Sequence, residues 1–576
     1  MKPIRLLRNP ARFAVFRKNT QFLLIIIGVI VGVVSGIAAV ILARSLEFTL
    51  EFLHDFRHMW WAFLLPGAGA MISSIFLEKV MNEGAGHGVP EVIYSVFRRA
   101  GLLRFRSSFS RLISSWLTIG SGGSAGPEAP VVMSGAVIGS NIARYFYLND
   151  RQRVTLVGCG GAGAIAAIFN APLTGMVFAL EGILGEWSIK NFIPIAVASV
   201  AGAETSRILQ GNNVLFESGS FSIGGFDLAA SVGLAVATAF ASLCLTRTLR
   251  HMHHISAHVP LPLYMRAALG GMAVGLLAYL VPDVLGEGYH SIDLMIQGVF
   301  RDGLLIVAVA GLAKILATGF TLGWGGSGGV FAPSLVIGSF TGIAYHRLIV
   351  TLFPNLPMVN EGCFALLGIA GLISGLLQAP LTGMFLALEI TGGYEVILPL
   401  IIVSALSTTI ASHFEPVSFY LKDLADRGQI LRPGTDQRVL ADISITEVID
   451  TDCTRVHPGM LLRELLEVVK VSSRDFFPVE ERDTGKFVGM VHFEHVRPYL
   501  FNTIMYDTVF VEQLMDPNPL TVSPDEELSE VLQMMDLKNL FSVPVVINGR
   551  FTGMVSKATL LDRYRNELNV QTSHIY

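Results

Sequence analysis

The chain contains little charge and little cysteine for its length. Only 15% of its 576 residues are charged, against roughly 25% in ordinary soluble domains. The four cysteines (Cys159, Cys244, Cys363 and Cys453) are scattered and form no CxxC pair. Their spacing excludes a disulfide framework and favours small buried side chains. The net charge of −4 is too small to imply nucleic acid as a partner, and the 52% hydrophobic content excludes a disordered or collagen-like chain.

The charge that is present is concentrated at the C-terminal end. From Leu421 onward, 24 acidic and 16 basic residues occur in 156 positions, a share typical of a soluble domain. The preceding 420 residues are much poorer in charge, as in a membrane protein. We therefore predict a membrane domain over residues 21–420, a linker over 421–440 and a soluble tail beyond it.

The N-terminal region is basic and leads into a long apolar run. No acidic residue precedes Glu47, and Phe22–Ala43 is uncharged for 22 residues. That length exceeds the apolar core of a signal peptide and is sufficient to cross about 30 Å of hydrocarbon. We predict a retained first span of a multi-pass cell-membrane protein. The positive-inside bias places residues 1–20 in the cytoplasm, and we expect the C-terminus there too.

The membrane part repeats itself. Asn170-Ala-Pro-Leu-Thr-Gly175 recurs as Gln378-Ala-Pro-Leu-Thr-Gly383, and Gly126-Pro-Glu-Ala-Pro130 has a counterpart in Gly329-Val-Phe-Ala-Pro333. The two offsets, 208 and 203 residues, report nearly the same period and predict a duplication. Interrupted segments at matching positions in two halves point to a transport site between them. The repeats are predicted to span about 21–225 and 226–420; the repeat alone leaves open whether they are parallel or inverted.

The tail also contains a repeat, displaced by 64 to 66 residues. Three short motifs occur twice in the same order: Val456-His-Pro458, Phe477-Pro-Val479 and Gly489-Met-Val491, then Val522-Ser-Pro524, Val543-Pro-Val545 and Gly553-Met-Val555. Alternating apolar strands and amphipathic helices predict a pair of small α/β modules. Their predicted ranges are 441–505 and 506–576.

Glu128 is the most informative residue of the membrane part. It lies in otherwise uncharged sequence between Arg111 and Arg144, and an ionisable group at membrane depth is a functional candidate by default. A helix beginning at Gly126–Pro130 would direct its free N–H groups and positive dipole end at an anion. When ionised, Glu128 would occupy that site, and when protonated it would leave. The alternative is a loop at the membrane interface with Glu128 in water.

Two further glycine–proline motifs could begin helices of the same kind. Gly329–Pro333 would supply a second set of N–H donors, and Gly86-His-Gly-Val-Pro90 a third. Glycine allows sharp turns and close backbone approach, and proline fits the first helical turn. Three such motifs within one duplicated membrane domain favour an anion pathway over a surface loop.

At these motifs the chain resembles the CLC family of chloride channels and proton-coupled chloride exchangers. GHGVP at 86–90 resembles the family's GSGIP, GPEAP at 126–130 its GREGP, and GVFAP at 329–333 its GxFxP, while Pro416–Tyr420 matches the segment that carries the pore tyrosine. The tail resembles the pair of CBS domains that many members carry. The resemblance implies a polytopic α-helical membrane protein of two inverted repeats with broken helices, followed by an α/β CBS pair. It also implies a homodimer with one pathway per subunit.

The resemblance implies roles for individual residues. Glu128 corresponds to the gating glutamate, and the remaining positions would bind chloride or a similar small anion. These anion-binding positions are His87, Gly88, Val89, Val330, Phe331 and Tyr420. His87 replaces the family's usual serine, so its imidazole would donate to the anion or turn away; this puts the preference for chloride over nitrate in doubt. Pro127 replaces the arginine before the gate.

The residue that supplies protons from inside is a further departure. Proton-coupled members commonly carry an internal glutamate where this chain has Gly182, and the adjacent Glu181 is retained. Glu181 is therefore either a substitute proton relay or an acid that packs at a helix end. Passive channel and proton-coupled exchanger both stay open.

Other interpretations of the sequence have weaker support. Arg250-His-Met-His-His254 with His258 looks like a metal cluster, but no carboxylate or cysteine joins it at ligand spacing, so we predict a cytoplasmic loop and no metal. No cofactor is required; an adenine nucleotide at the CBS pair stays open, because His495 and Thr559 stand where an aspartate usually holds the ribose. The alternative is a CBS-regulated membrane enzyme or sensor. No His-Glu-x-x-His motif supports it, and we predict that the chain is not an enzyme.

Overall fold

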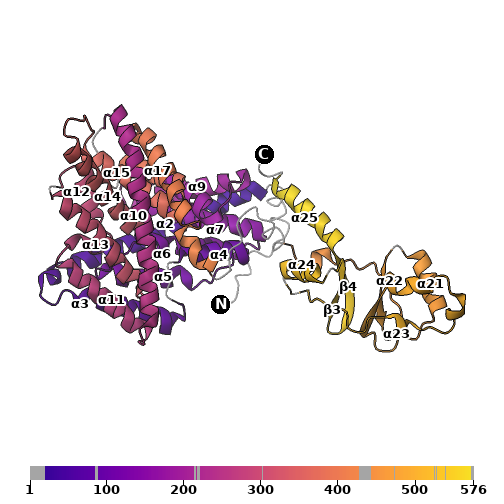
Figure 1. Cartoon of the computed structure of the whole chain (residues 1–576). Helices are drawn as coiled ribbons and strands as arrows, with labels where there is room; N and C mark the ends of the chain where they lie inside the picture. The colour runs from indigo at the N-terminus through magenta and orange to yellow at the C-terminus, as the bar shows by residue number, and fades with distance from the viewer. Residues whose placement is uncertain are drawn as a thin grey trace. The chain divides into compact units, whose positions relative to one another are not determined.

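The computed structural model describes residues 20–84, 88–212, 216, 221–300, 302–426, 443–472, 474–524, 526, 528–538 and 540–572. The chain divides into two compact units, Met1–Ile430 and Leu431–Tyr576 (Figure 1). Among the described residues, eight helices of the first unit are long and apolar enough to cross a membrane. The protein is an integral membrane protein with a C-terminal α/β part.

Within its described residues, the first unit consists of two sets of eight α-helices in the same order, followed by one short helix. The first set is α2 (Thr20–Leu53), α3 (Leu64–Ile75), α4 (Val89–Arg98), α5 (Ser107–Gly120), α6 (Glu128–Tyr145), α7 (Asp150–Phe169), α8 (Pro172–Phe178) with the π-turn η4 (Ala179–Leu184), and α9 (Ile189–Gln210). The second set is α10 (Gly225–His258), α11 (Leu263–Ala278), α12 (Tyr289–Ile296), α13 (Leu304–Gly323), α14 (Phe331–Leu352), α15 (Glu361–Leu377), α16 (Pro380–Thr391) and α17 (Ile397–Phe414), before α18 (Phe419–Asp426). The duplication predicted from two short motifs therefore extends over the whole membrane unit.

Glycines bring helix backbones into contact at equivalent places in both repeats. Between α6 and α7, a Cβ on Gly135 would lie 2.2 Å from the carbonyl oxygen of Gly160. Between α14 and α15, a Cβ on Gly338 would lie 2.6 Å from the carbonyl oxygen of Gly368. Small residues allow close packing of helices in lipid, where burial of apolar surface supplies little driving force. The repeat is thus preserved at the level of backbone contacts.

The repeats are inverted, and they meet at the starts of α6 and α14. The N–H of Gly126 donates to the carbonyl of Gly329 at 2.8 Å, and the N–H of Gly329 donates back to Gly126 at 2.7 Å. This is an antiparallel bridge between equivalent residues. A reciprocal pair of this kind is what a twofold relation between the halves produces. The two glycine-rich motifs therefore lie side by side at the centre of the unit.

One stretch of the sequence forms a different structure from the one predicted. The histidines from His251 to His258 were expected in a loop, and that expectation is wrong, because α10 continues to His258. After Gly233, no glycine or proline occurs until Pro260, so nothing stops the helix earlier. Within the described residues, no group of three or more His, Cys, Asp or Glu side chains could hold a metal.

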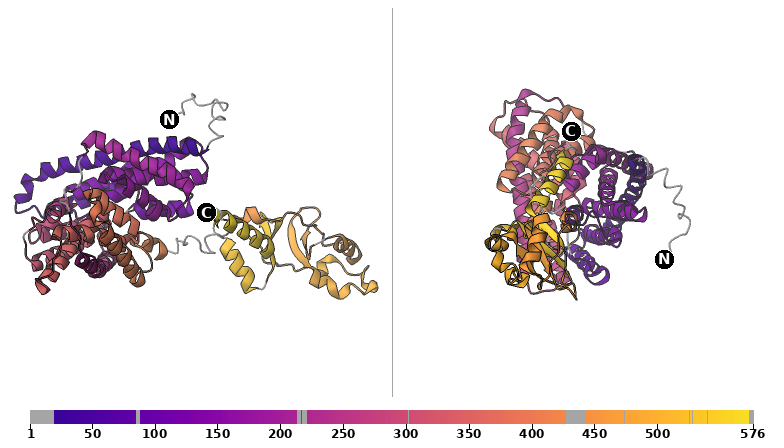
Figure 2. Two further views of the ribbon diagram at one scale, coloured as in Figure 1. Left: turned by 90° about the horizontal axis from the view of Figure 1, so that it is seen from above. Right: turned by 90° about the vertical axis from the view of Figure 1, so that its right-hand side faces the viewer.

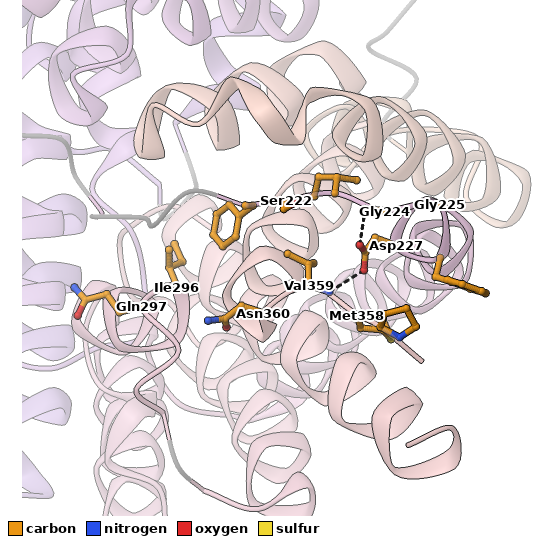
Figure 3. A pocket seen from close by; sticks show the side chains of 13 residues that line it. Ser222, Gly224, Gly225, Asp227, Ile296, Gln297, Met358, Val359 and Asn360 are labelled. Atoms are coloured by element: carbon orange, nitrogen blue, oxygen red, sulfur yellow. Dashed lines mark hydrogen bonds between the residues drawn. The ribbon is translucent and has the colours of Figure 1, made fainter. Parts of the chain in front are cut away.

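The opposite end of α10 anchors the loop that precedes α15. Asp227 is buried; its Oδ2 accepts from the N–H of Gly224 at 2.8 Å and its Oδ1 from the N–H of Val359 at 3.0 Å. Figure 3 shows both bonds beside a pocket of about 740 Å³ between the start of α10 and this loop. Asp227 thus ties the second repeat together near α15, as a side-chain acceptor at a helix start does.

The second unit contains two similar α/β modules (Figure 2). Its elements are α20 (Ile445–Val448), α21 (Leu462–Val471), β1 (Phe476–Glu480), β2 (Phe487–His492), α22 (Phe493–Val496), α23 (Val511–Leu514), α24 (Leu528–Leu537), β3 (Ser542–Ile547), β4 (Arg550–Ser556) and α25 (Lys557–Thr572). β1 pairs antiparallel with β2, and β3 with β4. Val456 bridges Val479 in parallel, and Val522 bridges Val545 in the same way 66 residues later. The predicted tandem of modules is present.

Candidate functional site

Glu128 is the first residue of α6, and its side chain is buried, with 1% of its surface exposed. Its Oε1 accepts a hydrogen bond from the hydroxyl of Tyr289 at 2.6 Å. Tyr289 is the first residue of α12, which belongs to the other repeat. Tyr289 was not among the predicted site residues, although it follows a Gly-x-Gly motif like the one before Val89.

The other oxygen of Glu128 lies between the starts of two helices. A Cβ on Gly126 would lie 2.0 Å from Oε2 of Glu128 and 2.9 Å from the backbone nitrogen of Ala332, the second residue of α14. The backbone N–H groups of Glu128 and Ala332 are the polar neighbours of this carboxylate. Within the described residues, Oε2 has no partner that meets the distance and angle limits of a hydrogen bond. The carboxylate therefore occupies the space that the helix N-termini of both repeats would offer to an anion.

The start of α14 is apolar in its side chains and polar in its backbone. Val330 and Phe331 are buried, and the ring of Phe331 lies 5.4 Å from that of Phe169 and 6.2 Å from that of Phe178, centroid to centroid. The aromatic side chain packs in a hydrophobic cluster, so only the N–H groups of this turn can serve an anion. The first N–H groups of a helix have no partner within the helix. Ala332 adds a residue to the donors predicted from the sequence.

The third glycine–proline motif, Gly86–Pro90, lies only partly within the described residues. α4 begins at Val89, which is fully buried, after Gly88 with φ of 82°. In the second repeat α12 begins at Tyr289, after Gly288, also with φ of 82°. A positive φ favours glycine at both positions. His87 lies outside the described residues, so its predicted role at the anion site stays a prediction.

Tyr420 is buried, at the second position of α18. This short helix packs against α4. α18 begins at Phe419, after the end of α17 at Phe414. The role of Tyr420 at the anion site stays a prediction.

Glu181 and Glu389 form a reciprocal pair of contacts across the repeats. Glu181 accepts from the N–H of Thr382 at 2.8 Å and from its hydroxyl at 2.7 Å. Glu389 accepts from the N–H of Thr174 at 2.7 Å and from its hydroxyl at 2.7 Å. Each carboxylate thus caps the first turn of α16 or α8 in the other repeat, where a negative charge is favourable. The geometry gives Glu181 a structural role that its equivalent shares.

Each repeat also holds one cation behind its Gly-x-Gly helix start. Lys314 of α13 is fully buried, and its Nζ donates to the carbonyls of Val284 at 3.1 Å and Gly286 at 3.0 Å. Arg111 of α5 is nearly buried, and its Nη2 donates to the carbonyl of Gly84 at 3.0 Å. Both cations bind the backbone that leads to α12 or α4, and so fix the direction in which those helices begin.

Comparison with known proteins agrees with this geometry. The family model described as "Voltage gated chloride channel" matches residues 69–412, more than half of the chain. The chain belongs to this family. The model of the CBS domain matches residues 511–566, the second of the two α/β modules.

Relatives of this family resemble the chain over most of their length. A ClcB-like chloride channel protein of Ralstonia nicotianae is 29% identical over 380 residues, which are 65% of this chain and 88% of that protein. The H(+)/Cl(-) exchange transporter ClcA of Salmonella agona is 28% identical over 362 residues, which are 61% of this chain and 76% of that protein.

Solved structures share the fold at lower identity. A slow cyanobacterial Cl−/H+ antiporter has a TM-score of 0.64 at 21% identity and covers 70% of this chain and 98% of its own. A CLC-type fluoride/proton antiporter has a TM-score of 0.59 at 22% identity, with 69% and 97% covered. A eukaryotic CLC transporter has a TM-score of 0.62 at 18% identity and covers 94% of this chain and 99% of its own. The membrane unit therefore has the CLC fold of two inverted repeats.

Proposed function

We propose that this protein moves chloride across the membrane in exchange for protons, along a pathway gated by Glu128. The observation that carries the proposal is the position of the Glu128 carboxylate between the N-termini of α6 and α14. A negative side chain in a site suited to anions competes with the transported ion for the same N–H groups. The family to which the chain belongs supports chloride as that ion.

The gate links anion movement to proton movement. An ionised Glu128 fills the site, and chloride enters when the carboxylate takes up a proton and leaves. The hydroxyl of Tyr289, 2.6 Å from Oε1, donates to the ionised form and so stabilises the closed position. Each opening therefore requires a proton, which is then available for transfer to the other side. The ClcA transporter, a relative at 28% identity, carries proton exchange in its name.

The second candidate function is passive conduction of chloride. It is favoured by Gly182, which stands where proton-coupled members commonly carry the internal glutamate, and by the engagement of Glu181 in a helix cap. In that case Glu128 would open and close the pathway without carrying protons through it. The relative from Ralstonia nicotianae is described as a channel protein.

Flux measurements on purified protein in liposomes separate the two functions. Under a chloride gradient, exchange predicts uphill proton movement and a reversal potential displaced from the chloride value. A channel predicts chloride flux at the chloride potential with no proton movement. The absence of anion flux at both acidic and neutral pH would reject transport altogether.

Substitution of Glu128 tests the gate itself. Glu128→Gln mimics the protonated side chain, so we expect chloride flux that no longer responds to pH and no proton movement. Glu204→Gln is a matched control, because Glu204 lies on α9 and its carboxylate pairs with Arg207 at 2.7 Å. The control should keep the pH response of the wild type. A pH response unchanged in Glu128→Gln would remove Glu128 from the gate.

The proposal includes a homodimer in the lipid bilayer with both termini in the cytoplasm, as in the family that the sequence resembles. His87 is proposed to tune anion preference, which a comparison of chloride and nitrate flux in His87→Ser would test.

An adenine nucleotide at the CBS pair stays a prediction. Against it, His495 lies 3.0 Å from the carbonyl of Leu514, and Thr559 bonds Ser556, so both side chains have local partners. Binding of ATP to the full-length protein, measured by equilibrium dialysis, would decide it.

A further inference from the structure

A shallow pocket of about 380 Å³ lies beside the C-terminal part of α10. Its lining residues are Arg247, Arg250, His251, His254 and Glu415. The apolar run of α10 extends over Leu228–Leu245, and Arg247 is the first charged residue after it. A change from apolar to basic sequence within one spanning helix marks the boundary between hydrocarbon and water. The pocket is therefore at the level of lipid headgroups.

The pocket contains more positive than negative charge. Three cations share the carboxylate of Glu415: Arg250 at 2.6 Å, Lys422 at 3.4 Å and Arg247 at 3.7 Å. One carboxylate balances one of them. Two positive charges are then left without a counter-charge in this group, before any contribution from His251 and His254.

Arg250 also has a hydrogen-bond donor that does not bond to Glu415, its Nε–H. Its Nη2 donates to Glu415, while its Nε is buried and has no hydrogen-bond partner among the described residues. Leaving a buried donor of a charged group unpaired is costly, and an acceptor that reached it would recover that energy. The side chain of Arg247 is 62% exposed and can turn toward a ligand in the pocket.

We propose that this pocket binds a phosphate group, presented by an anionic membrane lipid or by a soluble phosphate. A phosphomonoester carries about two negative charges near neutral pH, which matches the excess of the group formed by Arg247, Arg250, Lys422 and Glu415. Its oxygens suit the planar donors of arginine, and basic pockets between membrane helices bind phosphate headgroups. The site goes beyond the proposed transport function and involves none of the residues of the gate.

The pocket is connected to the helix that carries Tyr420. Glu415 lies between α17 and α18, and its backbone carbonyl accepts from the side chain of Gln378 at 2.6 Å. Lys422, which pairs with the same Glu415, belongs to α18, as does Tyr420. A phosphate that takes Arg250 from Glu415 changes the contacts that hold the start of α18. Ligand binding here should therefore alter the transport rate.

The experiment uses full-length protein in nanodiscs of phosphatidylcholine with or without phosphatidic acid. Bound lipid is detected by native mass spectrometry, and binding of inorganic phosphate is measured separately by equilibrium dialysis. The pocket variant is Arg247→Gln with Arg250→Gln. The control is Arg104→Gln with Arg106→Gln. Both arginines are exposed and precede α5, so these substitutions remove the same amount of charge at a place away from the pocket.

We expect the wild type and the control to retain phosphatidic acid or phosphate, and the pocket variant to bind about tenfold more weakly, as loss of a charge-assisted hydrogen bond predicts. Retention of phosphatidic acid alone identifies a lipid ligand, and binding of phosphate alone a soluble one. No binding by the wild type, or an equal loss in pocket variant and control, overturns the proposal. If the double variant fails to fold, Arg247→Gln alone serves, because this side chain is largely exposed.

Discussion

The two repeats of the membrane unit share their backbone and differ in the side chains at their meeting point. α6 begins with Glu128 and α14 with Phe331, at equivalent positions of the two glycine-rich motifs. The Glu128 carboxylate lies in the space between the helix starts, whereas the Phe331 ring is buried between Phe169 and Phe178. One repeat thus places a carboxylate between the helix starts, and the other contributes a buried aromatic ring and the backbone N–H of Ala332.

Features present in both repeats serve the scaffold. The glycine contacts between α6 and α7 and between α14 and α15, the crossed caps of Glu181 and Glu389, and the cations Arg111 and Lys314 all occur twice. Glu128 and Tyr289 occur once, and they contact each other. The comparison suggests a rule for this fold: a duplicated contact is structural, whereas Glu128 and Tyr289, whose contact has no equivalent, are candidates for the transport site.

The largest predicted loss of stability comes from replacing one of the two buried cations, Lys314 and Arg111. Lys314→Met keeps the length of the side chain and leaves three carbonyl oxygens without a donor, those of Asp283, Val284 and Gly286. Unsatisfied buried groups cost about 1–3 kcal/mol each, so we expect a loss of about 3–9 kcal/mol in stability for the three carbonyls. The check is the midpoint of thermal unfolding in detergent, followed by size-exclusion chromatography.

Arg111→Met is the matched variant in the other repeat. Glu83, which lies 3.7 Å from Nε of Arg111, also accepts from the hydroxyls of Ser107 and Ser110 at 2.7 Å each. The loop before α4 therefore keeps other anchors, and we expect a loss of about 1–3 kcal/mol. Equal losses in the two variants would show that the cations are interchangeable and would contradict this difference between the repeats.

Short motifs in the sequence predicted most of this architecture, because glycine and proline mark helix starts directly. The start of α6 at Glu128, the duplication and the tandem α/β modules all follow from such motifs. The contact between Glu128 and Tyr289 could not be predicted, because 161 residues separate them and no proline marks the start of α12. The shared Gly-x-Gly at 86–88 and 286–288 was the available signal.

Charge patterns were less reliable than glycine and proline. The histidines after Arg250 were predicted as a loop. Polar residues do not end a helix that has already formed, however, and α10 includes these histidines within its 34 residues. The role of Lys314 was also invisible, since its partners are backbone carbonyls, which no sequence pattern reports. Sequence patterns cannot predict the contacts of a side chain whose partners are backbone groups far along the chain.

An intermediate effect is predicted for the glycines where the repeats meet. A methyl group in Gly126→Ala would lie 2.0 Å from Oε2 of Glu128 and 2.9 Å from the nitrogen of Ala332. The carboxylate has to leave its position, so chloride flux in liposomes should lose much of its pH response, with a stability cost of about 1–3 kcal/mol. In Gly329→Ala the nearest atom, Cβ of Ala129, is 3.0 Å away, and the pH response should persist. Loss of the response in both variants would mean that the bridge, not the carboxylate, sets the gate.

The smallest predicted effect concerns the crossed carboxylates, and it tests whether Glu181 is a proton relay. Glu181→Ala removes the cap of α16, and Glu389→Ala removes that of α8. Loss of a helix cap costs about 0.5–2 kcal/mol, so both variants should show the same modest fall in unfolding midpoint. Because the two contacts are equivalent, we also expect both to keep the proton-to-chloride flux ratio of the wild type in liposomes. If only Glu181→Ala abolishes proton movement while both unfold alike, Glu181 carries protons in addition to capping a helix, and duplicated contacts in this fold are not solely structural.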